Sequence, residues 1–171
     1  DTSEKGIVSF GEHMRKILSY AGIDENKKII FYDDVTGMLA ARGVWLCLYF
    51  SHPDVQMLDG GYSKWIEEKK EVSKDIPTVI VSEFEVESFN KKPIASLNDI
   101  VEAQYNDDIQ ISDARVSKFY TGSVGRKDLA RKGRIPTAKL TPMIRYTKKV
   151  GNHFEILEKE KASKILNNND F

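Results

Sequence analysis

Two adjacent aspartates, Asp33 and Asp34, directly follow the short segment Lys27–Tyr32. The segment ends in four apolar or aromatic residues, which predict a β-strand buried on both faces of a parallel sheet. In α/β folds the loop at the carboxyl end of such a strand commonly carries the chemistry. This loop offers two carboxylates and no nucleophile, so its position suits an active site while its side chains do not supply one.

Cys47 is the only cysteine of the 171-residue sequence, so an internal disulfide framework is excluded. A thiol reacts as its thiolate, which forms near neutral pH only where charges or backbone amides lower its pKa. Cys47 lies in the apolar run Gly43–Phe50, which predicts a buried helix without such groups. We therefore favour a buried core thiol over a reactive one.

A second polar group follows the apolar segment "DIQIS". Asp113 and Arg115 come directly after it, and Lys118 and Arg134 lie further along the chain. The Asp113–Arg115 pair is either a salt bridge at the end of a strand or a support for a nearby site, and the residue types leave both interpretations open.

Two other patterns are read as structural rather than functional. Gly122–Asp128 has the glycines of a phosphate-binding loop but not the G-x-x-x-x-G-K-[ST] spacing, so we favour a surface loop. The three histidines, at positions 13, 52 and 153, are scattered without the spacing of metal ligands. We expect no metal and no cofactor.

The first half of the chain predicts alternating helices and strands. A capping box at Ser9–Glu12 predicts the start of a helix that Gly22 ends. The apolar segment Leu39–Phe50 predicts a helix covered on both sides, Val55–Leu58 predicts a strand, and Asp59–Gly61 predicts a turn into a helix around Trp65.

Residues 67–93 lack helical periodicity and predict an extended linker that wraps a surface, with a partly strand-like piece near Thr78–Phe84. A second capping box, Ser96–Asp99, opens a predicted helix. The remaining predicted elements are strands at Ile109–Ser112 and Ala138–Leu140, a short helix at Val116–Tyr120 and a helix at Glu155–Leu166. Strands that alternate with helices indicate a parallel α/β sheet.

The composition excludes several classes of protein. The 26 basic and 26 acidic residues give no net charge, which argues against nucleic acid as a partner. No apolar run is long enough to span a bilayer, so we expect no membrane association. The absence of a signal-peptide pattern and the single cysteine fit a cytoplasmic protein.

Ordered motifs over nearly the whole chain resemble one known family. "GIDENKKIIFYDD" and "AARGVWLCLYFSHPDVQMLDGGYSKW" resemble the latter half of the first domain of two-domain thiosulfate sulfurtransferases (rhodaneses), which include the mercaptopyruvate sulfurtransferases. "IASLNDI" resembles the entry to their second domain. "ISDARVSKFYTG" and "LARKGRIPTAKLTP" resemble a motif run within that domain.

The resemblance implies a rhodanese-like α/β fold, with a parallel sheet flanked by helices on both faces, incomplete or composite here. It implies that residues 1–68 are the latter half of a first, inactive domain, 69–93 an interdomain linker and 94–171 the first half of a second domain. The implied reaction moves sulfane sulfur from thiosulfate or mercaptopyruvate to a thiophilic acceptor such as cyanide. A cysteine persulfide carries the sulfur, and the resemblance implies that this cysteine is absent from a chain that is a fragment.

The resemblance also implies roles for the candidate residues. Asp33, with Asp34 beside it, stands where the first domain carries a degenerate copy of the active loop, and a carboxylate cannot accept a sulfane sulfur. Asp113, Arg115, Lys118 and Arg134 are candidates for supporting the active loop or attracting an anionic sulfur donor. Two positions depart from the family pattern: Phe119 replaces an arginine that contacts the donor, and Arg134 replaces a histidine.

Two alternatives remain open at this stage. The chain could instead be a non-catalytic rhodanese-like binding or regulatory module. Its two half-domains could also associate, so that the strands at Ile29–Tyr32 and Ile109–Ser112 join one composite sheet, within a chain or between two chains.

Overall fold

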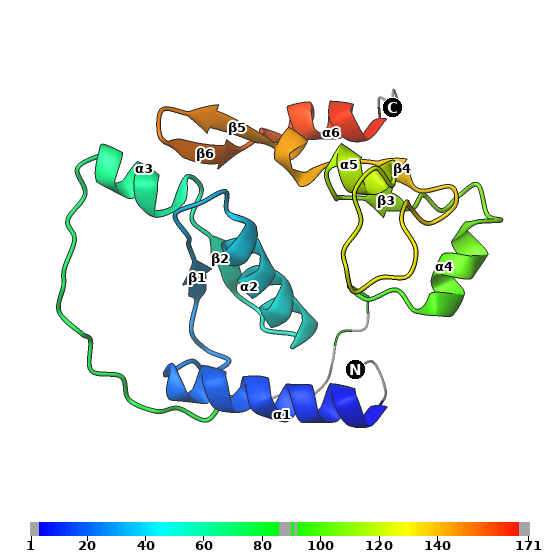
Figure 1. The fold of residues 1–171 in the computed structure, drawn as a ribbon. Helices are drawn as coiled ribbons and strands as arrows, with labels where there is room; N and C mark the ends of the chain where they lie inside the picture. The colour runs from blue at the N-terminus through cyan, green and yellow to red at the C-terminus, as the bar shows by residue number, and fades with distance from the viewer. Residues whose placement is uncertain (1–3, 86–89, 91, 168–171) are drawn as a thin grey trace. The chain divides into compact units, whose positions relative to one another are not determined.

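The computed structural model describes residues 4–85, 90 and 92–167 and divides into two compact units, Asp1–Pro93 and Ile94–Phe171. Each unit combines helices with a pair of short parallel strands (Figure 1). The predicted α/β class is therefore confirmed.

The first unit is built around the parallel strands β1 (Ile29–Phe31) and β2 (Val55–Met57). The helix α2 (Met38–Tyr49) connects them and packs against both, and α3 (Gly61–Glu67) follows β2. Ile29 is buried, whereas 53% of Ile30 is exposed. The prediction that this strand is buried on both faces is wrong, because its apolar composition does not reveal that α2 covers one face only.

The helix α2 is likewise covered on one side. Ala40, Cys47 and Tyr49 are buried, but Leu39 and Leu48 are exposed. The prediction that this helix is covered on both sides is therefore wrong. Cys47 is 1% exposed, which agrees with its interpretation as a core residue.

The helix α1 extends over Glu4–Tyr20, so Ser9 and Glu12 lie within it and the predicted capping box is wrong. Ser9 is exposed, where water satisfies its hydroxyl and a helix tolerates it. The predicted end at Gly22 is confirmed: its φ is +73°, its N–H donates to Ser19 O, and the Ile23 N–H donates to Leu18 O. These two bonds form a Schellman motif.

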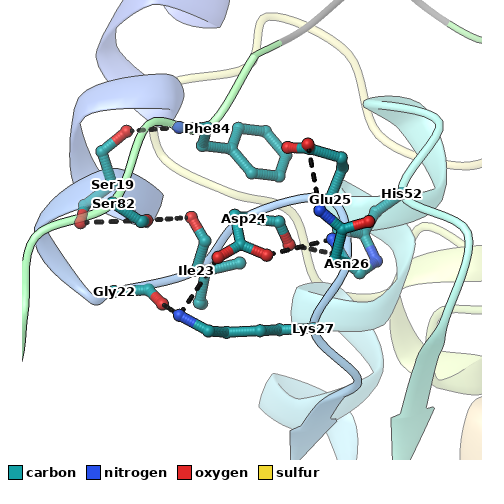
Figure 2. A network of polar contacts seen from close by, with 10 residues as sticks. All are labelled: Ser19, Gly22, Ile23, Asp24, Glu25, Asn26, Lys27, His52, Ser82 and Phe84. Carbon is teal, nitrogen blue, oxygen red and sulfur yellow. Dashed lines mark hydrogen bonds and ion pairs between the residues drawn. The ribbon is translucent and has the colours of Figure 1, made fainter.

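The segment after α3 forms no helix or strand over residues 70–85, yet it is attached to α1 (Figure 2). The Ser82 N–H donates to Ser19 O over 3.0 Å, and the Phe84 N–H donates to Ser19 Oγ over 3.0 Å. The Phe84 side chain is 1% exposed and packs with Leu18, Tyr49 and Phe50. An extended segment thus completes the core of the first unit.

His52 supports the buried Phe84 ring. The two rings are stacked with centroids 6.1 Å apart. The Asp54 N–H donates to Nδ1 of His52, so Nε2 carries the hydrogen that it donates to Asp24 O over 3.1 Å. His52 therefore joins the loop after α1, the approach to β2 and the extended segment (Figure 2).

The second unit begins with α4 (Leu97–Ala103), where Ser96 and Asp99 form the predicted capping box. The parallel strands β3 (Ser112–Asp113) and β4 (Lys139–Leu140) follow, with α5 (Ser117–Tyr120) between them. Ala103, Ile111 and Ala138 form its core. The strand predicted over Ile109–Ser112 is shorter than expected, because only Ser112 and Asp113 pair with β4.

The sequence analysis missed a β-hairpin. A 3₁₀ turn, η1 (Met143–Tyr146), leads into the antiparallel strands β5 (Thr147–Val150) and β6 (His153–Ile156), and α6 covers only Lys159–Asn167. The helix predicted from Glu155 is therefore wrong over its first four residues. Gly151, with φ +53°, turns the chain so that Lys148 forms an ion pair with Glu155 over 2.6 Å.

The composite sheet within one chain is also contradicted. β1 pairs with β2 and β3 pairs with β4, in separate two-stranded sheets. None of the helices in the described residues is long and apolar enough to cross a membrane.

The buried Phe84 gives a direct test of the extended segment. We expect Phe84→Ala to lower the free energy of unfolding by about 3–4 kcal/mol, because it leaves a large cavity in the core. Ile76→Ala, in the same segment but at a side chain that is 93% exposed, should cost less than about 0.5 kcal/mol. Equal effects of the two variants in urea denaturation would contradict the packing of Phe84.

Candidate functional site

The Asp33 carboxylate lies in a cradle of backbone N–H groups between β1 and α2. Oδ1 accepts from the N–H of Val35 and Gly37 over 3.0 and 2.9 Å. Oδ2 accepts from the N–H of Leu39 and Ala40 over 2.9 and 3.0 Å. Both oxygens of one side chain thus satisfy donors from the loop and from the first turn of α2.

Glycines allow this loop to close. Gly37 precedes α2 with φ +79°, a conformation that glycine adopts without strain and that directs its N–H to Asp33. Gly61, at the start of α3, lies so close to the Asp33 carbonyl that a Cβ would come within 2.0 Å of its oxygen. That carbonyl accepts from the Tyr62 N–H over 2.9 Å, so the turn after β2 fixes the loop after β1.

The cradle favours a negative charge. Partial burial raises the pKa of the Asp33 carboxyl, but the four N–H donors outweigh it and hold the pKa below its ordinary value. The positive end of the α2 dipole acts in the same direction. Asp34 is exposed and has no hydrogen bond or ion pair to the described residues. The two adjacent aspartates, which the sequence grouped as one candidate site, therefore have different environments.

This arrangement can stabilise an anion but provides no nucleophile. A thiolate or persulfide needs oriented N–H donors of this kind, since its charge is otherwise costly away from bulk water. A carboxylate already occupies the donors here. The loop has the geometry of an anion-binding loop, and the Asp33 side chain fills it.

An open pocket of about 440 Å³ lies beside this loop in the first unit. Tyr32, Tyr62 and Trp65 contribute to its lining, and the two tyrosine rings are stacked with centroids 6.4 Å apart. Cys47 is not among its lining residues. Burial raises the pKa of the Cys47 thiol to about 11, so this group is protonated near neutral pH.

In the second unit the structure brings Asp113 and Arg115 together at the end of β3. Arg115 Nε lies 2.9 Å from Asp113 Oδ1, and Arg115 Nη2 lies 2.5 Å from Oδ2. The side-chain hydrogen bonds from Arg115, together with its N–H and charge, hold the pKa of Asp113 below its ordinary value despite partial burial. Arg115 Nη2 also donates to Gly133 O over 2.8 Å, which ties the strand to the long loop after α5.

Lys118 and Arg134 lie over aromatic rings. The Lys118 ammonium is 5.6 Å from the centre of the Phe119 ring, and the Arg134 guanidinium is 4.4 Å from that of Tyr120. Both cations are close to the Asp113–Arg115 pair in the sequence, and neither has a carboxylate partner within the part of the chain that the structure describes. In the described residues, no group of three or more His, Cys, Asp or Glu side chains could hold a metal ion.

Sequence reasoning missed the donors that surround Asp33 and a small basic pocket in the second unit. The glycine four residues after Asp33 was the signal for the first, because it permits the turn that points N–H groups back at a carboxylate. Arg126, Arg131 and Lys132 line the second, with Leu129. Its signal was the high density of basic residues between Arg115 and Arg134.

Comparison with known proteins shows what this chain is similar to. The rhodanese-like domain family matches residues 3–68. The putative thiosulfate sulfurtransferase SseA of Mycobacterium leprae is 28% identical over 94% of this chain and 56% of its own length. The 3-mercaptopyruvate sulfurtransferase of Escherichia coli is 26% identical over 78% of this chain and 46% of its own length. The chain thus spans about half the length of the curated relatives it matches.

The fold comparison agrees. The crystal structure of SseA from Escherichia coli, described as having the rhodanese fold, matches 95% of this chain and 58% of its own length with a TM-score of 0.74. Sequence identity is 24%, so this likeness supports the fold alone.

The charge on Asp33 gives a stability prediction. In Asp33→Asn an amide NH₂ replaces one acceptor oxygen and faces the N–H donors, so we expect a loss of about 1–3 kcal/mol near pH 7. Urea denaturation of the matched variant Asp34→Asn should show less than about 0.5 kcal/mol, because Asp34 is exposed.

The loss should depend on pH. A carboxyl whose pKa is lower in the folded state contributes its full stability above the unfolded value of about 3.9 and loses it as the pH falls through the folded value. The difference between the parent chain and Asp33→Asn should therefore shrink below about pH 4. A difference that stays constant down to pH 2 would show that the charge of Asp33 contributes nothing.

Proposed function

We propose that the chain is part of a sulfurtransferase that moves sulfane sulfur from thiosulfate or mercaptopyruvate to a thiophilic acceptor such as cyanide, because the rhodanese-like domain family matches residues 3–68. The names of the relatives, a putative thiosulfate sulfurtransferase in Mycobacterium leprae and a 3-mercaptopyruvate sulfurtransferase in Escherichia coli, support this class of reaction. In it, a cysteine thiolate attacks the sulfane sulfur, the rest of the donor leaves with the bonding electrons, and a persulfide remains.

The observation that carries the proposal is the N–H cradle around Asp33. It has the donors that a persulfide loop needs, and it lies at the carboxyl end of a parallel strand and the start of a helix. Because Asp33 fills it, we propose that this loop is the inactive copy. The cysteine that reacts would then be supplied from outside these 171 residues.

We assign the second unit to the binding of the anionic donor in the intact protein. Arg115 is held by Asp113 and by Gly133 O, which fixes its guanidinium at the end of β3. Lys118 and Arg134 add positive charge on the neighbouring elements α5 and the loop before β4. Positive charge of this kind attracts thiosulfate or a carboxylate donor.

A second candidate is a non-catalytic rhodanese-like binding module. The burial of the only thiol, together with its raised pKa, favours this alternative for the chain taken by itself. The two candidates differ in whether a reactive cysteine joins these residues in the functional protein.

An assay of the purified chain tests the inactivity of its own residues. We expect no thiosulfate:cyanide sulfurtransferase activity above background, because the Cys47 thiol is buried and protonated. Cys47→Ser should leave that result unchanged. Turnover by the parent chain that disappears in Cys47→Ser would contradict the assignment.

A cysteine placed at position 33 tests the loop itself. In Asp33→Cys, made in a Cys47→Ser background, we expect the four N–H donors to lower the thiol pKa from about 8.5 to below about 7.5. The rate of alkylation by iodoacetamide against pH reports that pKa. Incubation with thiosulfate should then add one sulfur atom to the intact mass.

The matched control is Asp34→Cys in the same background, since this position has no N–H cradle. It should keep an ordinary thiol pKa and gain no sulfur. Identical pKa values at the two positions would contradict the proposal that the loop retains the architecture of a persulfide site.

A further inference from the structure

The segment Arg115–Arg134 concentrates positive charge in a chain that has none overall. Its 20 residues include seven basic side chains and one acidic side chain, a net charge of +6, while the full sequence is neutral. The segment covers α5 and the loop that leads toward β4 (Figure 1). Charge of this density repels itself and destabilises a fold, so its concentration on one loop calls for an electrostatic role.

Hydrogen bonds and close packing hold this loop in a defined shape. Its start is fixed by the Val124 N–H, which donates to Lys118 O over 3.0 Å. Its end is fixed by Arg115, which donates to Gly133 O. The two ends meet: a Cβ on Gly122 would lie 3.1 Å from the backbone nitrogen of Gly133. The loop therefore presents its side chains without a large further cost in ordering.

A pocket of about 160 Å³ opens within the loop. Phe119, Val124 and Leu129 give it an apolar lining, and Val124 and Leu129 are 43% and 55% exposed. Arginine and lysine side chains surround this apolar floor. The pocket can take one aliphatic side chain while its rim contacts the negative charges on either side.

Two of the rim cations are free to pair. Arg126 is bound to Asp128 over 2.7 Å, and Arg115 is bound to Asp113. Arg131 and Lys132 are exposed, and neither has a carboxylate partner among the residues that the structure describes. They are the cations that an incoming anion would meet first.

We propose that Arg115–Arg134 is a docking surface for an acidic peptide segment of a partner protein, in which an apolar side chain between carboxylates enters the pocket. Charge complementarity gives the acidic character, and the apolar floor gives the single hydrophobic side chain. A single-stranded nucleic acid fits less well, because it needs free aromatic faces for stacking. Arg134 covers Tyr120, and Lys118 lies over Phe119. The surface goes beyond sulfur transfer, since it needs no reactive cysteine.

Fluorescence anisotropy of the full chain at low ionic strength tests the proposal with three labelled probes. The first is a nonapeptide with four glutamates on each side of one leucine. The second replaces the leucine by serine, and the third is a nonathymidylate of similar charge. We expect the leucine peptide to bind about fivefold more tightly than the serine peptide and more tightly than the oligonucleotide.

Matched variants locate the surface. Arg131→Glu with Lys132→Glu should weaken binding of the leucine peptide at least about tenfold. Arg15→Glu with Lys16→Glu, the same change at an exposed pair on α1, should alter it less than about twofold. Leu129→Ser should make the leucine and serine peptides bind equally. Circular dichroism of each variant verifies that it is folded.

Four results would overturn the proposal. Tighter binding of the oligonucleotide would assign the surface to nucleic acid. Equal affinity for the leucine and serine peptides in the parent chain would leave the pocket without a role. Equal losses in the two charge-reversal variants, or no binding of the leucine peptide at millimolar concentration, would show that this loop is not a docking surface.

Discussion

Four backbone N–H groups that converge on the Asp33 carboxylate are the interaction on which the first unit depends. They connect the end of β1 to the start of α2, and the Asp33 carbonyl connects the same point to α3. Without a negative group at this position, four donors would face one another in a partly buried loop, which is costly. The Asp33 carboxylate therefore holds the loop in a shape that suits an anion while occupying the donors itself.

The proposal that this loop is an inactive copy of a persulfide loop rests on this constraint. A carboxylate and a persulfide are both anions of similar reach, and the same donors stabilise either. Replacing a thiol by a carboxylate removes the polarisable atom that accepts sulfur but keeps the charge that the donors require. The rhodanese-like domain family matches residues 3–68, and a putative thiosulfate sulfurtransferase is among the proteins that this chain resembles.

Local signals in the sequence predicted the features that depend on neighbouring residues. The capping box at Ser96, the end of α1 at Gly22 and the buried thiol of Cys47 all follow from a few adjacent side chains. The capping box expected at Ser9 failed because an exposed serine is also tolerated inside a helix. The expected helix at Glu155 failed because the turn at Gly151 pairs β6 with β5, and that pairing overrides helix propensity.

Contacts between residues far apart in the sequence could not be predicted from such local signals. Phe84 stands between two glutamates in a charged, irregular segment, yet it is among the most buried side chains because Ser19 and Leu18, 65 or more residues earlier, provide its partners. The N–H cradle of Asp33 is local in sequence, but it depends on the path of the backbone, which Gly37 permits and does not by itself specify. Its position after a predicted strand located Asp33 and the family resemblance suggested a role for it, but only the structure shows what its carboxylate contacts.

The pKa of Asp33 in the folded chain shows directly whether a charged carboxylate fills the N–H cradle. Carbon-13 NMR of the Asp33 carboxyl carbon, followed as a function of pH, reports its pKa. We expect a midpoint below the ordinary aspartate value of about 3.9, with the amide proton shifts of Gly37 and Ala40 moving at the same midpoint. A midpoint at or above that value, or amide shifts that do not follow it, would contradict the claim that a carboxylate fills this cradle.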